Sequence, residues 1–199
     1  MIAYLRGTLL AKHPNQVIVE TNGVGYEVNS PVSTFSALPS NGAEVRLQIH
    51  THVREDALSL FGFATPEEKG LFERLISVSG IGPKLAITVL SGLATAALIT
   101  AIRAGQVEHL VRIPGVGKKT AERMVLELRD KLDLIPGVPA AQAATAGDVL
   151  SALDRDVLSA LLNLGCSRPS AEAAVLKAKA GGTPEEFEPL FRRALELVR

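Results

Sequence analysis

Two short stretches of the sequence carry glycine and lysine at the same spacing and could bind phosphate groups. Residues 75–86 (LISVSGIGPKLA) align with residues 110–121 (LVRIPGVGKKTA) at an offset of 35 residues. The leucine, both glycines, one lysine and the last alanine are identical, and the other apolar positions correspond in kind. Each copy predicts the end of an apolar helix, a Gly-apolar-Gly turn and a second helix that opens with lysine.

The glycines of these two turns indicate an anion site. They are Gly80, Gly82, Gly115 and Gly117. Glycine permits a tight turn with positive φ and lets a ligand approach the backbone without meeting a Cβ atom. The amides of the turn and of the next helix's first turn then lack partners, which suits phosphate. Ile81 and Val116 are expected to anchor each turn in the core.

The lysines strengthen this interpretation. Lys84, Lys118 and Lys119 stand near predicted helix N-termini, where the helix dipole disfavours cations. A local preference that is broken at matching positions indicates function. The expected contacts are with phosphate oxygens, and binding should therefore be independent of base sequence and sensitive to salt.

Two alternatives apply to these glycine turns. One is that each turn merely closes a helical hairpin, but two copies with the same downstream Lys-x-Ala favour binding. The other is a nucleotide-binding P-loop at 117–118, which would need glycine at 112 and serine or threonine at 119. Arg112 and Lys119 stand there instead. We therefore predict no ATP site, no cofactor and no catalytic residue.

Composition narrows the class of protein. The chain has 199 residues, 21 basic and 21 acidic side chains and one cysteine, which excludes a disulfide scaffold or a multi-cysteine metal site. Residues 64–133 are the only third of the chain with a positive net charge, with 10 basic and 8 acidic side chains. The N-terminus does not read as a signal peptide, and Ser91 and Gly92 are expected to split the uncharged stretch 85–102 into two short buried helices. A soluble cytoplasmic protein is expected.

The elements that must position the glycine turns follow a β-then-α order. Residues 1–63 read as five short strands, over 4–10, 16–21, 24–29, 45–53 and 58–63. They are rich in Val, Ile, Leu and aromatic residues, with a tight turn at Asn22-Gly23. Five strands in this length favour a small closed barrel of the OB type.

Helices are predicted from residue 65 onward. Thr65-Pro-Glu-Glu68 is typical of a capping box with proline at the first helical position. Residues 64–134 form the predicted tandem hairpin domain, and 135–147 (IPGVPAAQAATAG) read as a flexible linker. Residues 148–199 predict three helices, over about 148–163, 168–180 and 184–198, the last capped by Thr183-Pro-Glu-Glu186. The fold class is thus α+β and multidomain.

The two glycine turns resemble tandem helix–hairpin–helix motifs, and the whole chain resembles the RuvA family, the Holliday-junction-binding proteins of bacterial branch migration. The resemblance covers essentially all 199 residues. Its segments are 5–7 (LRG), 23–28 (GVGYEV), 53–57 (VREDA), 80–86 (GIGPKLA) and 114–123 (PGVGKKTAER). The hairpin alone is shared by many DNA enzymes, whereas the order and number of these segments are much more specific.

The resemblance implies an architectural role in DNA recombination and repair. A homotetramer would hold the four arms of a junction open, and two tetramers could enclose the DNA. The implied DNA-binding residues are Gly80, Gly82, Lys84, Gly115, Gly117, Lys118, Lys119 and Arg123. The domain at 148–199 would bind the hexameric ATPase RuvB, and the junction-resolving nuclease RuvC is a further candidate partner. A purely structural role for this domain stays open.

Glu55 and Asp56 lie between the last two predicted strands. Adjacent carboxylates in a loop are usually only solvated, and on a DNA-binding surface they would repel the phosphates. The resemblance implies that this pair forms an acidic pin at the tetramer centre. Our hypothesis is that the clustered charge repels phosphates and guides strands apart at the crossover.

The alternative functions are a general helix–hairpin–helix DNA-binding module or a glycosylase-like repair enzyme. A glycosylase would want an aspartate after the second hairpin, for which Asp130 and Asp133 are available, and an aromatic pocket for a flipped base. Residues 64–133 contain a single aromatic residue, Phe72. This favours the binding protein.

Other candidate residues carry weaker signals. His50 and His52 alternate along a predicted strand and share a face, but no third metal ligand is evident, and a surface pair is favoured. Cys166 has no catalytic context. The leucine-rich third domain needs most of its apolar side chains for a core, so the sequence does not separate core from docking residues. These side chains are Leu158, Leu161, Leu162, Leu164, Leu190, Phe191, Leu195 and Leu197.

Overall fold

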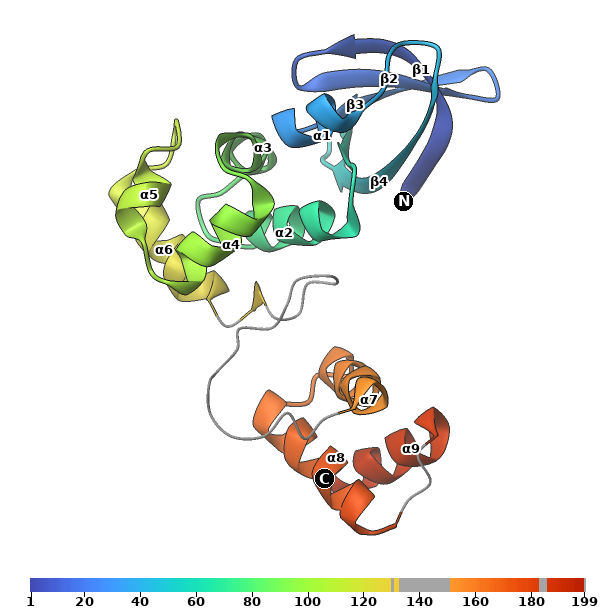
Figure 1. Cartoon of the computed structure of the whole chain (residues 1–199), viewed down its shortest axis with the longest axis vertical. Helices are drawn as coiled ribbons and strands as arrows, with labels where there is room; N and C mark the ends of the chain where they lie inside the picture. Colours follow the sequence, from blue (N-terminus) through green and yellow to red (C-terminus); the bar gives the residue numbers. More distant parts are fainter. Residues whose placement is uncertain (130, 133–150, 183–185, 199) are drawn as a thin grey trace. The chain divides into compact units, whose positions relative to one another are not determined.

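The structure is a computed structural model that describes residues 1–129, 131–132, 151–182 and 186–198. The chain divides into two compact units, Met1–Gln142 and Ala143–Arg199, which we consider separately (Figure 1). The linker predicted over 135–147 lies outside the described residues. So do residues 183–185 of the predicted third cap, and the candidate residues Asp130 and Asp133.

The first unit begins with a five-stranded closed barrel. Its strands are β1 (Tyr4–His13), β2 (Gln16–Thr21), β3 (Val24–Asn29), β4 (Glu44–Val53) and β5 (Leu58–Phe63), in the spatial order β1-β2-β3-β5-β4. All neighbours are antiparallel except β3 and β5, where Val28 pairs with Leu60. Inward-pointing strand residues and Leu38, which follows a short helix, form an apolar core of Leu5, Leu9, Val17, Val19, Val28, Leu38, Val45, Leu47, Ile49 and Leu60. The predicted OB-like barrel is confirmed.

One connection of the barrel agrees with the prediction from the sequence, and another contains a helix that was not predicted. Asn22 and Gly23 have φ values of 51° and 84°, as the predicted two-residue turn requires. The short helix α1 (Val32–Ala37) between β3 and β4 was not predicted. It follows Pro31, buries Thr34, and leads into Leu38, whose side chain joins the barrel core.

Five helices follow the barrel within the described residues of the first unit. They are α2 (Pro66–Ile76), α3 (Pro83–Gly92), α4 (Thr95–Arg103), α5 (Val107–Val111) and α6 (Lys118–Leu128). Only Ala64 and Thr65 separate β5 from α2. Thr65 caps α2 as predicted, since its Oγ1 accepts a hydrogen bond from the amide of Glu68 at 3.2 Å. The reciprocal half of the predicted capping box is wrong, because the Glu68 carboxylate turns to Thr34 and to the amide of Ala64.

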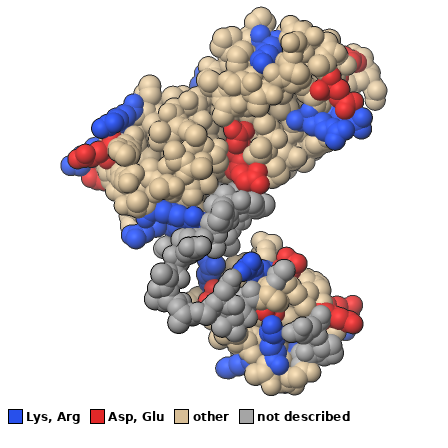
Figure 2. Space-filling view, viewed as in Figure 1, with Lys and Arg blue, Asp and Glu red and all other residues tan. Residues whose placement is uncertain are grey.

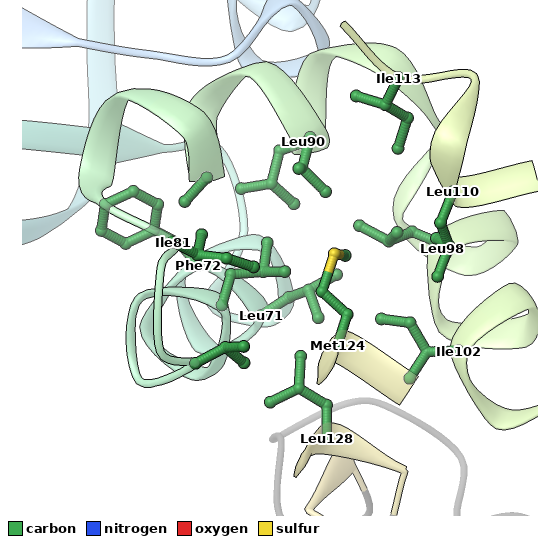
Figure 3. Packing of buried hydrophobic residues seen from close by; sticks show 14 of the residues in the cluster. Leu71, Phe72, Ile81, Leu90, Leu98, Ile102, Leu110, Ile113, Met124 and Leu128 are labelled. Atoms are coloured by element: carbon green, nitrogen blue, oxygen red, sulfur yellow. The ribbon is translucent and has the colours of Figure 1, made fainter. Parts of the chain in front are cut away.

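These helices share one apolar core (Figure 3). Figure 3 shows Leu71 of α2, Leu90 of α3 and Met124 of α6 around one core, to which Phe72 of α2 also belongs. Phe61 and Phe63 of β5 belong to the same cluster, and the ring centroids of Phe63 and Phe72 lie 4.9 Å apart. The apolar core of the helices therefore reaches into the barrel.

The uncharged stretch 85–102 is divided into two helices, as predicted. The axes of α3 and α4 are bent by 101° relative to each other, and the break between them is at Leu93 and Ala94. None of the described helices is long and apolar enough to cross a membrane alone, and only this bent pair reaches the necessary length and composition together.

The part of the second unit that the structure describes contains three helices, α7 (Ala152–Asn163), α8 (Arg168–Ala180) and α9 (Phe187–Leu197). Ser151 and Asp154 form a reciprocal capping box at the start of α7, and the buried Asp154 carboxylate also accepts a hydrogen bond from Lys179 Nζ at 2.8 Å. Burial acts to raise the pKa of Asp154, but the hydrogen bonds from Lys179 and Ser151 outweigh it and lower the pKa. The cap thus also ties α7 to the last turn of α8.

Candidate nucleic-acid interface

The two glycine turns have the same backbone structure. In the first, Val78 N–H donates to Leu75 O at 3.1 Å and Ile81 N–H donates to Val78 O at 3.0 Å. In the second, Ile113 N–H donates to Leu110 O at 3.1 Å and Val116 N–H donates to Ile113 O at 3.0 Å. The first intrahelical bonds that follow, from Ala86 to Gly82 and from Ala121 to Gly117, also correspond at 3.0 and 2.9 Å. The internal repeat is therefore a repeat of hydrogen bonds as well as of residue types.

The two glycines of each turn differ in their reason for being glycine. Gly80 and Gly115 have φ values of 91° and 82°, a left-handed conformation that side chains disfavour. Gly82 and Gly117 instead have extended backbones, with φ values of −87° and −82°. A Cβ atom added at either of them would meet no heavy atom within 4 Å. Packing within the described residues therefore does not require glycine at these two positions, whereas close approach of an external ligand would.

The residues between the paired glycines anchor the turns. Ile81 and Val116 are each 4% exposed and belong to the apolar core of the helices, as predicted. With these side chains turned inward, the backbone of each turn faces outward. Gly80, Gly82, Gly115 and Gly117 are all exposed.

The outward backbone presents amide donors at two helix N-termini. Gly82 and Gly117 are the N-cap residues of α3 and α6, and glycine has no side chain with which to cap the helix amides. The first amides of a helix have no intrahelical partner, and the helix dipole places partial positive charge there. Each turn can therefore hold an oxyanion.

Three lysines flank these amides. Lys84 lies in the first turn of α3, and Lys118 and Lys119 lie in the first turn of α6. All three are exposed, and among the described residues no ion pair involves them. In Figure 2 basic side chains gather over the α5–α6 part of the molecule, with acidic ones among them. The charges are free to meet an external anion.

Arg123 of α6 connects the two hairpins. Its Nη1 donates to the carbonyl oxygen and to Oγ of Ser79, both at 3.3 Å, and Ser79 directly precedes the first glycine turn. A Cβ added at Gly115 would in turn lie 3.1 Å from Cδ1 of Leu85 in α3. The two turns thus lie side by side, and each contacts the helix that the other begins. No pattern in the sequence indicated Ser79 or Leu85 as partners, because both contacts are long-range.

Glu55 and Asp56 occupy the tip of the β4–β5 hairpin. Val53 pairs with Leu58 at the end of the ladder, and the amide of Arg54 donates to Ala57 O at 2.8 Å. Both carboxylates are exposed. The loop position expected from the sequence is therefore occupied by a narrow acidic projection, which we call the acidic tip.

The histidines of β4 have protein partners. His50 Nδ1 lies 3.2 Å from Oε1 of Glu73 in α2, and its ring packs edge-on against Phe72. His52 Nε2 accepts a hydrogen bond from Arg54 Nε at 3.1 Å. No cluster of three or more metal-ligating residues occurs within the described residues. These contacts favour the structural interpretation of the pair.

The structure does not favour the glycosylase alternative, which needs an aromatic side chain at a pocket for the flipped base. Phe72, the aromatic residue that such an enzyme would need at a pocket, is fully buried and stacks on Phe61 with centroids 5.1 Å apart. Its position between barrel and helices makes it a core residue.

A groove on α6 was not anticipated from the sequence. It is lined by Val107, Glu122, Val125, Leu126 and Arg129. Leu126 is 81% exposed, although it lies on a helix whose other face is buried in the core. A leucine between charged residues on the polar face of an amphipathic helix is the signal that could have identified it.

The apolar side chains of the second unit fall into a buried group and an exposed group. Leu158, Leu161 and Leu190 are core residues, and Leu162, Phe191 and Leu197 pack against them, as most of the predicted set should. Leu164 and Leu195 are exposed, together with Leu176 and Phe187, which were not singled out from the sequence. These four residues, which we call the exposed apolar set, are available to a partner.

Comparison with known proteins extends over the whole chain. A family model described as "RuvA N terminal domain" matches residues 1–62, and one described as "SAM-like Helix-hairpin-helix tandem" matches residues 72–130. A relative from Solibacter usitatus named "Holliday junction branch migration complex subunit RuvA" is 68% identical, over 100% of both chains. Relatives of the same name from Acidobacterium capsulatum and Syntrophotalea carbinolica are 60% and 48% identical, over at least 99% of each chain.

Proposed function

The chain belongs to the RuvA family, and from this premise we infer that it binds the four-way Holliday junction as a subunit of a branch migration complex. The duplicated glycine turn carries the inference at the level of the site, because two oxyanion-binding helix N-termini lie side by side. Such a pair fits phosphates of one DNA arm without reading its bases. The chain would contribute binding and geometry, and an ATP-driven motor of the RuvB type would do the mechanical work.

The proposed DNA contacts divide between backbone and side chain. Gly80, Gly82, Gly115 and Gly117 would bring the turn amides against phosphate oxygens, while Lys84, Lys118, Lys119 and Arg123 would add charge. The contacts with lysine and arginine release counterions, so affinity should fall steeply with salt. A chain with no net charge can bind DNA in this way because the basic groups gather around the two turns.

Four copies of the chain would give the geometry that a junction requires. Each copy would hold one arm through its hairpins, and the weak single contacts would add through effective concentration. The acidic tips of four copies would meet at the crossover and repel phosphates there. Shape rather than sequence would then determine specificity.

The α6 groove supports the pairing of two such tetramers. Glu122 and Arg129 lie about two helical turns apart, with Val125 and the exposed Leu126 between them. An antiparallel copy of α6 would place Glu122 opposite the copy's Arg129 and bury both leucines, which is the self-complementarity of a two-fold interface. Leu126→Asp should prevent two tetramers from pairing on junction DNA in sedimentation experiments. Leu10→Asp, which replaces another exposed leucine, on β1, should not.

The second unit is the proposed docking site for the motor. Its exposed apolar set gives a small helical domain more uncovered apolar surface than its own fold needs. Leu164→Asp should weaken stimulation of a RuvB-type motor and leave junction binding intact. Ser159→Asp, at an exposed position on α7, the helix that Leu164 caps, is the control. Loss of junction binding in the leucine variant would contradict a docking role. RuvC stays a candidate partner on the same junction, tested by its cleavage in the presence of the chain.

The first experiment is a gel-shift titration of the chain with a four-way junction and with a linear duplex of equal length, over a salt series without nucleotide. A strong and salt-sensitive preference for the junction supports the proposed function. Equal affinity for the two DNAs would reduce the protein to a general duplex binder, and excision of a damaged base would identify a glycosylase.

The acidic tip has its own test. Replacing Glu55 and Asp56 by glutamine keeps the shape of the tip and removes its charge. We expect the preference for junction over duplex to relax and the speed of branch migration to change. Parental discrimination and parental migration in the double variant would show that the tip has no such role.

A further inference from the structure

The proposed site has two parts that lie on different elements of the first unit. The phosphate-binding turns begin α3 and α6, whereas the acidic tip ends the β4–β5 hairpin. A junction presents its crossover and its arms at fixed relative positions. Recognition therefore depends on what fixes the angle between the barrel and the helices.

The Glu68 carboxylate makes the most buried polar contact at this boundary. It is on α2, and the residue is 7% exposed. Its Oε2 accepts a hydrogen bond from Thr34 Oγ1 at 2.6 Å and from the amide of Ala64 at 3.3 Å. Thr34 is fully buried on α1, and its Oγ1 accepts a hydrogen bond from the same Ala64 amide at 3.0 Å. Three elements, α1, α2 and the end of β5, meet at this one group.

A second contact ties α1 to the first hairpin. The amide of Val32 donates to Ser91 Oγ at 3.1 Å, and Ser91 Oγ donates to Ile87 O within α3 at 2.7 Å. The end of α1 is fixed to the barrel, because Leu38 enters the barrel core. The short helix α1 is therefore a strut that is held by the barrel at one end and by α2 and α3 along its length.

The apolar part of the boundary cannot supply the same orientation. Phe61, Phe63 and Phe72 bury surface between barrel and helices, but hydrophobic contact is non-directional. A mostly buried carboxylate costs free energy unless its partners are in place, so only one arrangement satisfies it. Rotation of the two parts would break the directional Glu68–Thr34 hydrogen bond, whereas ring contacts depend less strictly on orientation.

We propose that Glu68 and Thr34 are positioning residues that fix the angle between the acidic tip and the glycine turns, and so determine the preference for a four-way junction over duplex. The proposal rests on the proposed function, since it concerns the specificity of that same site. Neither side chain needs to touch DNA. Duplex binding, in which the hairpins contact a single DNA arm, should not depend on this angle.

The test compares Thr34→Val with Thr34→Ser. Valine keeps the shape of threonine and removes the hydroxyl group, whereas serine keeps the hydroxyl group. We expect the valine variant to lose about tenfold or more of its junction affinity, because arms held at a wrong angle no longer bind together. Its duplex affinity and its salt slope should stay near parental values, and the serine variant should behave as the parent. Glu68→Gln, which can still accept both hydrogen bonds, should also retain the preference.

A distance measurement provides the second readout. Cys166 is the only cysteine of the chain, so Cys166→Ser gives a background for spin labels at Ala57→Cys on the acidic-tip hairpin and Ala97→Cys on α4. Labelled chain is diluted with unlabelled chain to isolate distances within one copy. We expect Thr34→Val to broaden or shift the distance distribution while circular dichroism still reports a folded protein.

The outcomes separate this proposal from the function on which it rests. No junction preference in the parental chain would overturn the proposed function itself. A parental preference that survives in folded Thr34→Val would overturn only the positioning role. Equal losses of junction and duplex binding would also overturn it, since they would indicate general damage to the fold.

Discussion

The first glycine turn leads into a helix that begins with Pro83 and Lys84, whereas the second leads into one that begins with Lys118 and Lys119. The backbone hydrogen bonds of the two turns nevertheless agree to within 0.1 Å. Proline at the first position has no amide hydrogen, so the second hairpin offers one more donor and one more charge than the first. The spacing of glycine and apolar residues therefore determines the geometry of the turn, while the residues after it determine how strongly it can bind.

The surroundings of the two turns differ as well. A Cβ added at Gly115 would press on Leu85, a core-facing side chain, at 3.1 Å. At Gly80 the nearest atom is Arg123 Nη1 at 3.9 Å, the far end of a flexible side chain. Ile81 and Val116 anchor both turns in the core, and the second turn is further constrained by Leu85 and the first by the hydrogen bonds of Arg123.

The largest expected effect concerns the glycines without internal contacts. We expect Gly117→Ala and Gly82→Ala to fold as the parent does, because their backbones are extended and their surroundings open. Each should weaken junction binding by about tenfold or more, the equivalent of a lost hydrogen bond to a charged group. The loss should be greater for Gly117→Ala, in the hairpin with two lysines. Gel-shift titration measures the affinity, and thermal unfolding confirms the fold. Parental binding by both variants would show that phosphate does not approach these turns.

A second effect separates the two turns by stability. Alanine at Gly80 or Gly115 must adopt a left-handed φ, which costs about 1–2 kcal/mol. Gly115→Ala should lose more stability than Gly80→Ala, because its Cβ also presses on Leu85. Urea unfolding of the two variants measures the difference. Equal losses would mean that Leu85 shifts freely and does not constrain the second turn.

A third effect concerns charge. Removing phosphate contacts lowers the slope of log affinity against log salt by about 0.9 per contact. The double variant Lys118→Ala, Lys119→Ala should therefore lower this slope, per bound copy, by about twice as much as Lys84→Ala does. Lys69→Ala on α2, away from both turns, serves as the control. An unchanged slope would mean that these lysines do not reach phosphate.

The smallest effect distinguishes the two uses of Arg123. Its Nη1 holds Ser79, and its remaining N–H groups can face phosphate. Arg123→Ala should lower the salt slope by about one unit. Ser79→Ala removes one of the two acceptors and should leave the slope unchanged. If Arg123→Ala lowers affinity without changing the slope, the arginine only links the hairpins.

The sequence predicted the parts of the fold that depend on local pattern. All five strands were located, four of them to within one residue at each end, because alternation and the Asn22-Gly23 turn are local signals. Both glycine turns followed from their repeat. The helix α1 was missed, because it is six residues long and is held by Thr34 and Leu38 through long-range contacts.

The sequence indicated which residues form the candidate site, but not how they contact one another. The repeat identified the glycines and lysines, and the resemblance added Arg123, Glu55 and Asp56. A capping box describes Glu68 from its neighbours in sequence, but a residue 34 positions away takes its carboxylate. The contact of Leu85 with Gly115 was equally invisible, because a repeat shows that two units are alike and not how they pack.

The join between β5 and α2 has a mechanical consequence. Ala64 and Thr65 are the only residues between the strand that carries one side of the acidic tip and the helix that begins the hairpin domain. The Ala64 amide is itself held by Thr34 and Glu68. A connection this short has no slack. If a motor turns the DNA arms as proposed, the torque on the hairpins would pass through this short connection to the barrel, and the barrel would resist rotation together with the DNA.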